Sequence, residues 1–185
     1  MQIASSPCAP SLRIIDAEVS YNAVEAIQAI CQACPNLRSL HLRDCSADID
    51  GDEIIETVVQ HCPLIEALPT SCELTDTAFN ALANIHTLKE LQVSAGDCSS
   101  EAVQRVVRAN PHLTLVRIKM PIVDDALVRC IGDYSGNVTS LNLLQAGGTP
   151  SQSINTVSNH ARLDLFPGCP QLKFFYLSKP GGMPR

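Results

Sequence analysis

The stretch Cys34-Pro-Asn-Leu37-Arg-Ser-Leu40-His-Leu42-Arg-Asp-Cys45 contains the pattern that the rest of the chain repeats. Its leucines are spaced as L-x-x-L-x-L, and a proline stands two residues before the first of them. Alternate side chains of an extended strand point to opposite faces, so Leu40 and Leu42 are expected to point into a core. The stretch therefore predicts a short strand that is buried on one face only.

The same skeleton recurs along the whole chain of 185 residues. Its first apolar position occurs seven times, at residues 12, 37, 65, 88, 113, 138 and 172. The successive spacings are 25, 28, 23, 25, 25 and 34 residues, which indicates a repeat architecture. The long final spacing predicts an insertion within residues 147–167, and residues 179–185 are expected to form a flexible tail.

The segments between the predicted strands have the periodicity of helices. Apolar residues recur at helical spacing in residues 23–31, 54–59, 78–82, 102–107 and 126–131. The last three segments are preceded by residues that often cap helix N-termini, namely Asp76, Ser99 or Ser100, and Asp124. A strand and a helix in each repeat predict one α/β domain over residues 1–185, with a curved parallel sheet inside and helices outside.

This pattern resembles the cysteine-containing subfamily of leucine-rich repeats, which includes the ribonuclease-inhibitor-like repeat regions of F-box proteins. Residues 34–45 match the strand half of the family unit, and residues 74–83 match its helix half. Gly96 and Pro121 stand where the family unit has a cysteine. The resemblance covers about residues 8–178 and implies a solenoid of about seven repeats, without an F-box, that binds other macromolecules.

Composition narrows the class of protein further. Hydrophobic residues make up 45% of the chain and aromatic residues only 4%, so the core must consist mainly of aliphatic side chains and cysteine. A net charge of −6 argues against a nucleic-acid partner, because binding phosphate requires clustered Lys and Arg. No segment has the roughly 18 apolar residues of a membrane helix, so no membrane association is expected.

The cysteines and the start of the chain predict a compartment. The nine cysteines are an odd number, and we interpret them as free, mostly buried thiols in a reducing environment. The first ten residues lack the basic and apolar regions of a secretory signal. We therefore expect a cytoplasmic protein, with a nuclear location possible and secretion excluded.

Three features could suggest chemistry, and each has a simpler structural interpretation. Cys31-x-x-Cys34 has the spacing of a redox or zinc motif, but the repeat places the two cysteines on a helix and at a strand entry. His41 and His61 have no nucleophile or carboxylate in a recognisable motif, and residues 48–53 lack the spacing of a calcium loop. We expect no catalytic residue, no metal and no cofactor, and hence no enzyme.

The outward positions of the strands would form one concave surface, which we expect to bind a protein partner. This surface includes Arg and Tyr, two residue types that are enriched in binding hot spots. The chain is then an adaptor or scaffold that binds its partner through this surface. The alternative is a structural subunit of a large stable assembly, held by its uncapped ends. Substrate recognition in a ubiquitin ligase is implied by the resemblance alone. The predicted binding residues are Asp16, His41, Arg43, Glu90, Gln92, Arg117, Lys119, Asn142, Phe174 and Tyr176.

Overall fold

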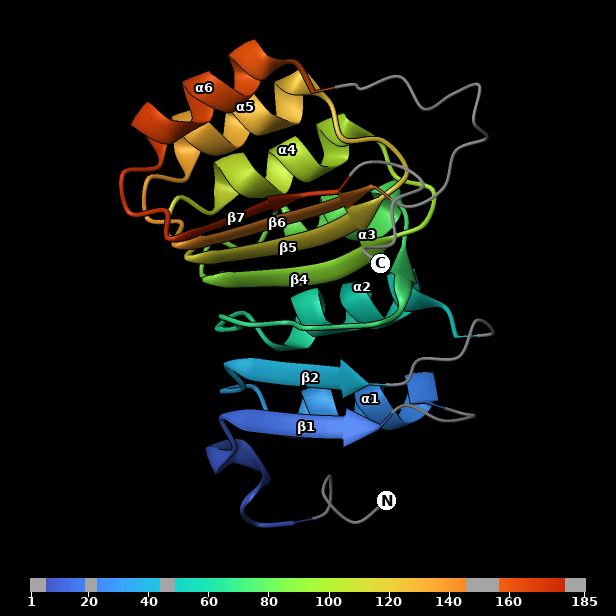
Figure 1. Cartoon of the computed structure of the whole chain (residues 1–185). Helices are drawn as coiled ribbons and strands as arrows, with labels where there is room; N and C mark the ends of the chain where they lie inside the picture. Colours follow the sequence, from blue (N-terminus) through green and yellow to red (C-terminus); the bar gives the residue numbers. More distant parts are fainter. Residues whose placement is uncertain (1–5, 19–22, 44–48, 146–156, 179–185) are drawn as a thin grey trace.

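A computed structural model describes residues 6–18, 23–43, 49–145 and 157–178. Strands and α-helices alternate in these residues (Figure 1), as the repeat pattern predicts. The expected tail at 179–185 and the first part of the expected insertion, 147–156, lie outside the described residues. In chain order the elements are η1 (Ala9–Ser11), β1 (Ile14–Glu18), α1 (Ala23–Ala33), β2 (Ser39–Arg43), α2 (Gly51–His61), β3 (Glu73–Leu74), α3 (Asp76–Leu82), β4 (Glu90–Ala95), α4 (Ser100–Ala109), β5 (Leu115–Met120), α5 (Asp125–Tyr134), β6 (Ser140–Gln145), α6 (Asn159–Gly168) and β7 (Phe174–Leu177).

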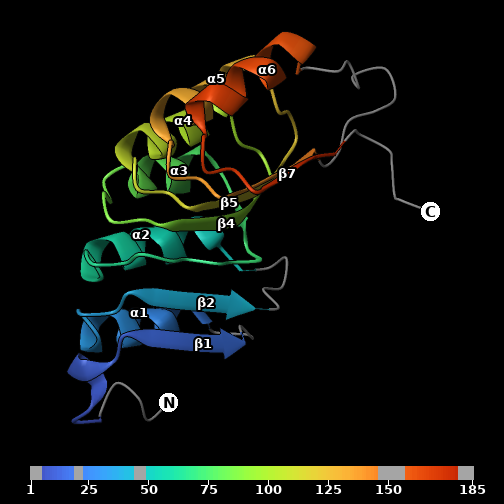
Figure 2. The same ribbon diagram turned by 60° about the vertical axis from the view of Figure 1, so that its left-hand side comes forward.

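The strands are parallel and lie side by side in the order of the chain. β1 and β2 form a two-stranded sheet, and β3, β4, β5, β6 and β7 form a five-stranded sheet. Each helix packs against the next one, from α1 through α6. The helices lie on one side of the strands (Figures 1 and 2), which leaves the other side of the sheets uncovered by helices. We call that side the open face.

The third predicted strand is irregular, and this divides the parallel array into two sheets. Only isolated bridges join residues 67–70 to the neighbouring strands β2 and β4. Pro69 has no N–H to donate, so this segment cannot complete a regular ladder. Its carbonyl still accepts from the Leu42 N–H at 2.9 Å, and the Thr70 N–H donates to the Gln92 carbonyl at 3.0 Å. The segment thus joins β2 and β4 by hydrogen bonds. The prediction of a regular strand at this position is wrong.

The core consists of thin aliphatic layers, one for each repeat. The first apolar position of the pattern is completely buried from the second copy to the sixth, at Leu37, Ile65, Leu88, Leu113 and Val138. Burying one such side chain contributes about 1.5–3 kcal/mol relative to leaving it in water. The same position in the first and last copies, Leu12 and Leu172, is only partly buried. Full burial therefore requires a neighbouring repeat on each side.

Helix α6 was not predicted from the sequence, which indicates only an insertion within residues 147–167. Its residues Asn159–Gly168 lie mostly within that range, yet they pack on α5 as another regular helix. The helix carries exposed apolar side chains at Leu163 and Phe166 and a proline at position 167, so its sequence lacks a clear apolar stripe. Periodicity alone could not detect it for that reason.

The helix starts are joined from repeat to repeat by carboxylates. In three places an Asp in the first turn of one helix accepts hydrogen bonds from the N-cap residue of the next repeat. The N-caps differ from the prediction at one point, because Thr75 and not Asp76 caps α3. Ser99 and Asp124 cap α4 and α5 as expected. The carboxylate pairs are Asp52 with Thr75, Asp76 with Ser99, and Asp125 with Ser158.

Two of these carboxylates predict how stability depends on pH. The Ser99 N–H (2.7 Å) and hydroxyl (2.8 Å) lower the pKa of Asp76, and the hydroxyl (2.7 Å) and N–H (2.6 Å) of Ser158 lower the pKa of Asp125. A carboxyl group whose pKa is lower in the folded than in the unfolded chain stabilises the fold at pH values above its unfolded pKa. This contribution is lost as the pH falls through the folded value.

We therefore expect the urea concentration at the midpoint of unfolding to decrease as the pH is lowered from about 6 to about 3. In the double variant Asp76→Asn/Asp125→Asn this midpoint should decrease less steeply over the same pH range. Urea titrations at several pH values, followed by circular dichroism, measure this. Asp97→Asn is the control, since Asp97 is exposed. An unchanged slope in the double variant would show that these carboxylates do not link the repeats.

Helices α5 and α6 approach so closely that a glycine is required at their contact. A Cβ at Gly168 would lie 2.1 Å from the carbonyl oxygen of Gly132 and 2.8 Å from its Cα. We expect Gly168→Ala to destabilise the protein by about 1–3 kcal/mol, because backbone must move to admit the methyl group. Gly136→Ala is the control, since its Cβ would meet only the Gly168 oxygen at 3.5 Å. Equal unfolding midpoints for the two variants would contradict this packing.

Candidate binding surface

The open face presents outward side chains in rows that cross the strands. The strand register places Asp16 beside His41, and Gln92, Arg117, Asn142 and Tyr176 beside one another. Ala67 pairs with Ser39 and with Glu90, so the rows continue across the irregular segment. The first row is Asp16, His41, Pro69, Gln92, Arg117, Asn142 and Tyr176; in the second, Glu18 lies beside Arg43, and Glu73, Ser94, Lys119 and Leu144 lie beside one another.

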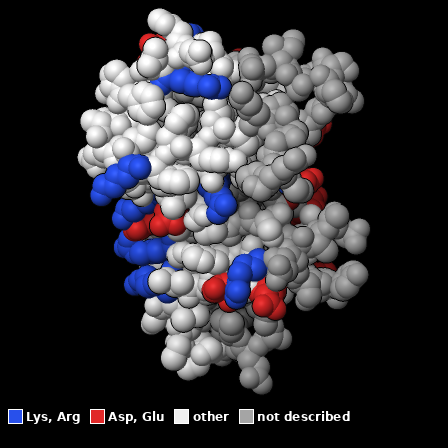
Figure 3. Space-filling view, viewed as in Figure 1, with Lys and Arg blue, Asp and Glu red and all other residues white. Residues whose placement is uncertain are grey.

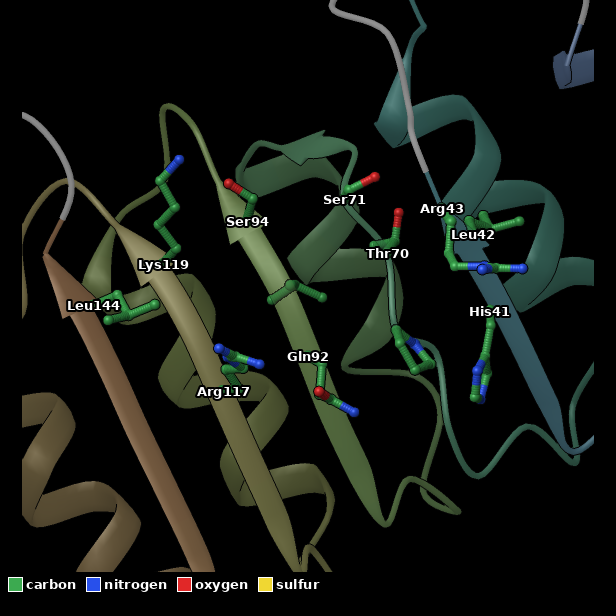
Figure 4. Close-up of a pocket in the computed structure, with 12 residues that line it drawn as sticks. His41, Leu42, Arg43, Thr70, Ser71, Gln92, Ser94, Arg117, Lys119 and Leu144 are labelled. Atoms are coloured by element: carbon green, nitrogen blue, oxygen red, sulfur yellow. The ribbon is translucent and has the colours of Figure 1, made fainter. Parts of the chain in front are cut away.

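A hollow of about 590 Å³ lies along these two rows and extends from β2 to β6. Figure 4 shows side chains from β2, the irregular segment, β4 and β5 around it. It is an open depression in the surface, and its residues come from five consecutive repeats, from residue 41 to residue 144 of the sequence. The lining residues are His41, Leu42, Arg43, Pro69, Thr70, Ser71, Gln92, Val93, Ser94, Arg117, Lys119 and Leu144.

The charged lining residues are all basic. Arg43 lies on β2 at one side of the hollow with His41, and Arg117 and Lys119 lie on β5 at the other side (Figure 4). Among the lining residues that the structure describes, none is Asp or Glu. Because the whole chain carries a net charge of −6, this local excess of positive charge is not a reflection of composition.

The basic groups differ in how far their charge is already neutralised. The Nε of Arg43 donates to Asp16 Oδ1 at 2.8 Å, an exposed pair on β1 and β2. Arg117 and Lys119 form no ion pair with any described carboxylate within 4.0 Å. Their charges therefore remain available to a ligand, whereas that of Arg43 is shared with Asp16.

Between the basic sides the floor of the hollow is uncharged and combines polar with apolar side chains. Gln92 and Ser94 rise from β4, and Thr70 and Ser71 lie on the segment that joins the two sheets (Figure 4). The Gln92 amide lies 3.5 Å from Glu90, at the limit of a hydrogen bond. Hydroxyl and amide groups of this kind can both donate to and accept from a bound peptide backbone.

The structure brings together half of the predicted binding residues. His41, Arg43, Gln92, Arg117 and Lys119 line the hollow. The other five lie on the same face but outside it: Asp16 on β1, Glu90 at the start of β4, Asn142 on β6, and Phe174 and Tyr176 on β7. The Oδ1 of Asn142 is buried without a hydrogen-bond partner among the described groups.

Other lining residues are absent from the predicted set. Ser71, Ser94 and Leu144 occupy outward positions of the repeat, so the strand alternation was the signal that could have found them. Thr70 occupies an inward position of the pattern and is buried, yet it borders the hollow. No sequence rule predicts this, because it follows from the irregular path around Pro69.

Glu90 borders a second, smaller hollow of about 300 Å³ near the beginning of the strands. There Glu66 binds both Arg38 and Lys89, with Lys89 Nζ at 2.7 Å, and these hydrogen bonds lower the pKa of Glu66. Figure 3 shows several basic side chains along the left margin, the side on which β1 and β2 begin in Figure 1. Exposed ion pairs of this kind contribute about 0–1 kcal/mol each, so we assign them no larger role.

Cys31, Cys34 and Cys62 are completely buried and close together. The Cys62 thiol lies 3.9 Å from the Cys31 carbonyl and 3.8 Å from the Cys34 carbonyl, at the C-terminal end of α1. The hydrogen bond with Cys62 and burial raise the pKa of Cys31, and burial raises the pKa of Cys34. Raised values keep both thiols protonated, which favours a packing role over nucleophilic chemistry.

Cys72 corrects the expectation that every cysteine is a free thiol. It is disulfide-bonded, whereas the other described cysteines, Cys8, Cys31, Cys34, Cys62, Cys98, Cys130 and Cys169, are free. Spacing in the sequence cannot show which cysteines meet in space, because pairing depends on the distance between their Cα atoms. Cysteine content therefore no longer argues for a reducing compartment.

Comparison with protein-family models and with curated proteins gives no match for this chain. In the described ranges, no group of three or more His, Cys, Asp or Glu side chains could hold a metal ion. No helix of the described part of the chain is long and apolar enough to cross a membrane. The assignment of a function therefore depends on the geometry of the open face.

The cysteine environments predict which thiols react in the native protein. We expect iodoacetamide at about pH 8 to modify the exposed Cys8 quickly, and Cys31 and Cys34 only after unfolding, because burial and raised pKa values suppress their thiolates. Peptide mass spectrometry after a timed exposure reads out each site. Rapid native labelling of Cys31 or Cys34 would contradict a purely structural role for the Cys31-x-x-Cys34 motif.

Proposed function

We propose that this chain is a leucine-rich-repeat solenoid that binds a protein partner through its open face and catalyses no reaction. The repeat pattern of the sequence and the parallel strands in chain order support the architecture. In such an array the strands form the inner, concave side, and their outward side chains make one continuous surface. The open face corresponds to that surface.

The single observation that carries the binding role is the hollow between β2 and β6. It is assembled from residues of five repeats, and exposed Arg117 and Lys119 border it without a described acidic partner. Basic side chains gathered on one face create a local positive potential that attracts acidic ligands. An adaptor or scaffold that recognises one partner accounts for this arrangement.

A structural subunit of a larger assembly is the second candidate, and a different observation favours it. The last repeat exposes apolar side chains on α6 and β7, with Leu163 65% exposed, Phe174 53% and Phe166 48%. The rings of Phe166 and Phe175 are in edge contact, with centroids 6.0 Å apart. Apolar groups gathered at an end are typical of a surface that another subunit covers.

The test is a quantitative pull-down of the tagged full chain from the cells that express it. We expect the triple variant Arg43→Ala/Arg117→Ala/Tyr176→Ala to lose its protein partner, because these side chains lie on the open face. The matched control is Arg105→Ala/Arg129→Ala/Tyr134→Ala, which removes the same residue types from α4 and α5. Equal circular dichroism spectra establish that both variants are folded.

Two other outcomes would overturn the proposal. A partner that the control variant loses and the open-face variant retains would place binding on the helices. A large stoichiometric set of partners, retained by both variants and lost with Phe166→Ser/Phe174→Ser, would support the structural subunit instead.

A further inference from the structure

We infer that the hollow accommodates an extended acidic peptide segment whose carboxylates form two clusters separated by about four residues. The inference rests on the proposed function and specifies the chemistry of the partner. It is argued from the placement of the basic side chains, the neutral floor between them and the residues that surround the hollow.

The positive charge is divided into two sites. His41 and Arg43 project from β2, and Arg117 and Lys119 from β5, with the irregular segment and β4 between them (Figure 4). Three strand intervals of about 4.8 Å separate the two sites by about 14 Å. A single phosphate or carboxylate cannot contact both, so the ligand must carry negative charge at two places.

An extended peptide fits this spacing. Its residues advance about 3.3 Å each, so side chains at positions i and i+4 lie about 13 Å apart on the same face of the chain. Acidic residues at both positions would meet Arg43 on one side and Arg117 on the other. The backbone between them would pass over Gln92 and Ser94, which can donate to its carbonyls and accept from its N–H groups.

The surroundings favour a peptide over a nucleic acid. Single-stranded nucleic acids are held by aromatic side chains that stack on the bases, and no aromatic ring other than the His41 imidazole lines the hollow among its described residues. Asp16 and Glu18 on β1 and Glu90 on β4 flank it, and they would repel a backbone that carries a phosphate at every nucleotide. A peptide with a neutral linker places its charges only where the basic residues lie.

The test measures binding of a fluorescein-labelled Glu-Glu-Ser-Gly-Glu-Glu peptide to the full chain by anisotropy. The control peptide Glu-Glu-Glu-Glu-Ser-Gly has the same composition with contiguous charges. We expect the spaced peptide to bind at least about fivefold more tightly, and Arg117→Glu/Lys119→Glu to weaken it by about tenfold or more. Arg105→Glu/Lys173→Glu changes the net charge equally away from the hollow and should leave its binding unchanged.

The outcomes separate this inference from the proposed function. Equal binding of both peptides, equal weakening by both charge reversals, or tighter binding of an oligothymidylate of equal charge would overturn the acidic-peptide inference. If the peptide fails to bind while the open-face triple variant still loses its cellular partner, the inference is wrong and the proposed function stands. Loss of neither ligand in the open-face variants would overturn both.

Discussion

The structure depends on the burial of aliphatic side chains between one repeat and the next. A strand of five or six residues with a short helix behind it cannot enclose its own leucines, so each layer needs a neighbour on both sides. The inner positions show this directly, because Leu37 and Leu113 are completely buried whereas Leu12 and Leu172 at the two ends are not. The core is therefore one elongated cluster that runs from the first described repeat to the last.

This constraint also produces the open face. The strand alternation that sends Leu40 and Leu42 into the core turns His41 and Arg43 outward, and parallel pairing in register aligns them with outward residues of later strands. Residues 41 and 117 thus approach the same hollow although 76 positions separate them in the chain. The carboxylate bonds between helix starts, such as that of Asp76 with Ser99, maintain the same register on the helical side.

Much of this arrangement could be predicted, and the failures have identifiable causes. The inner and outer positions of each strand follow from alternation, and five predicted residues, including Arg117 and Lys119, line the hollow. The regular strand expected at residues 67–70 fails because Pro69 lacks an N–H. Helix α6 was missed because its apolar residues are partly exposed at the end of the array, and periodicity detects only a stripe that faces a core.

The sequence by itself determined the repeat, the alternation of strands and helices, and the identity of the side chains that point outward. These properties are local, since they depend on spacing within about 25 residues. The tertiary structure alone decided that Cys72 is disulfide-bonded, that Arg43 is paired with Asp16, and that Arg117 and Lys119 face a neutral floor. Each of these depends on distances in space that spacing along the sequence does not set, and the last two depend on the packing of one repeat on the next.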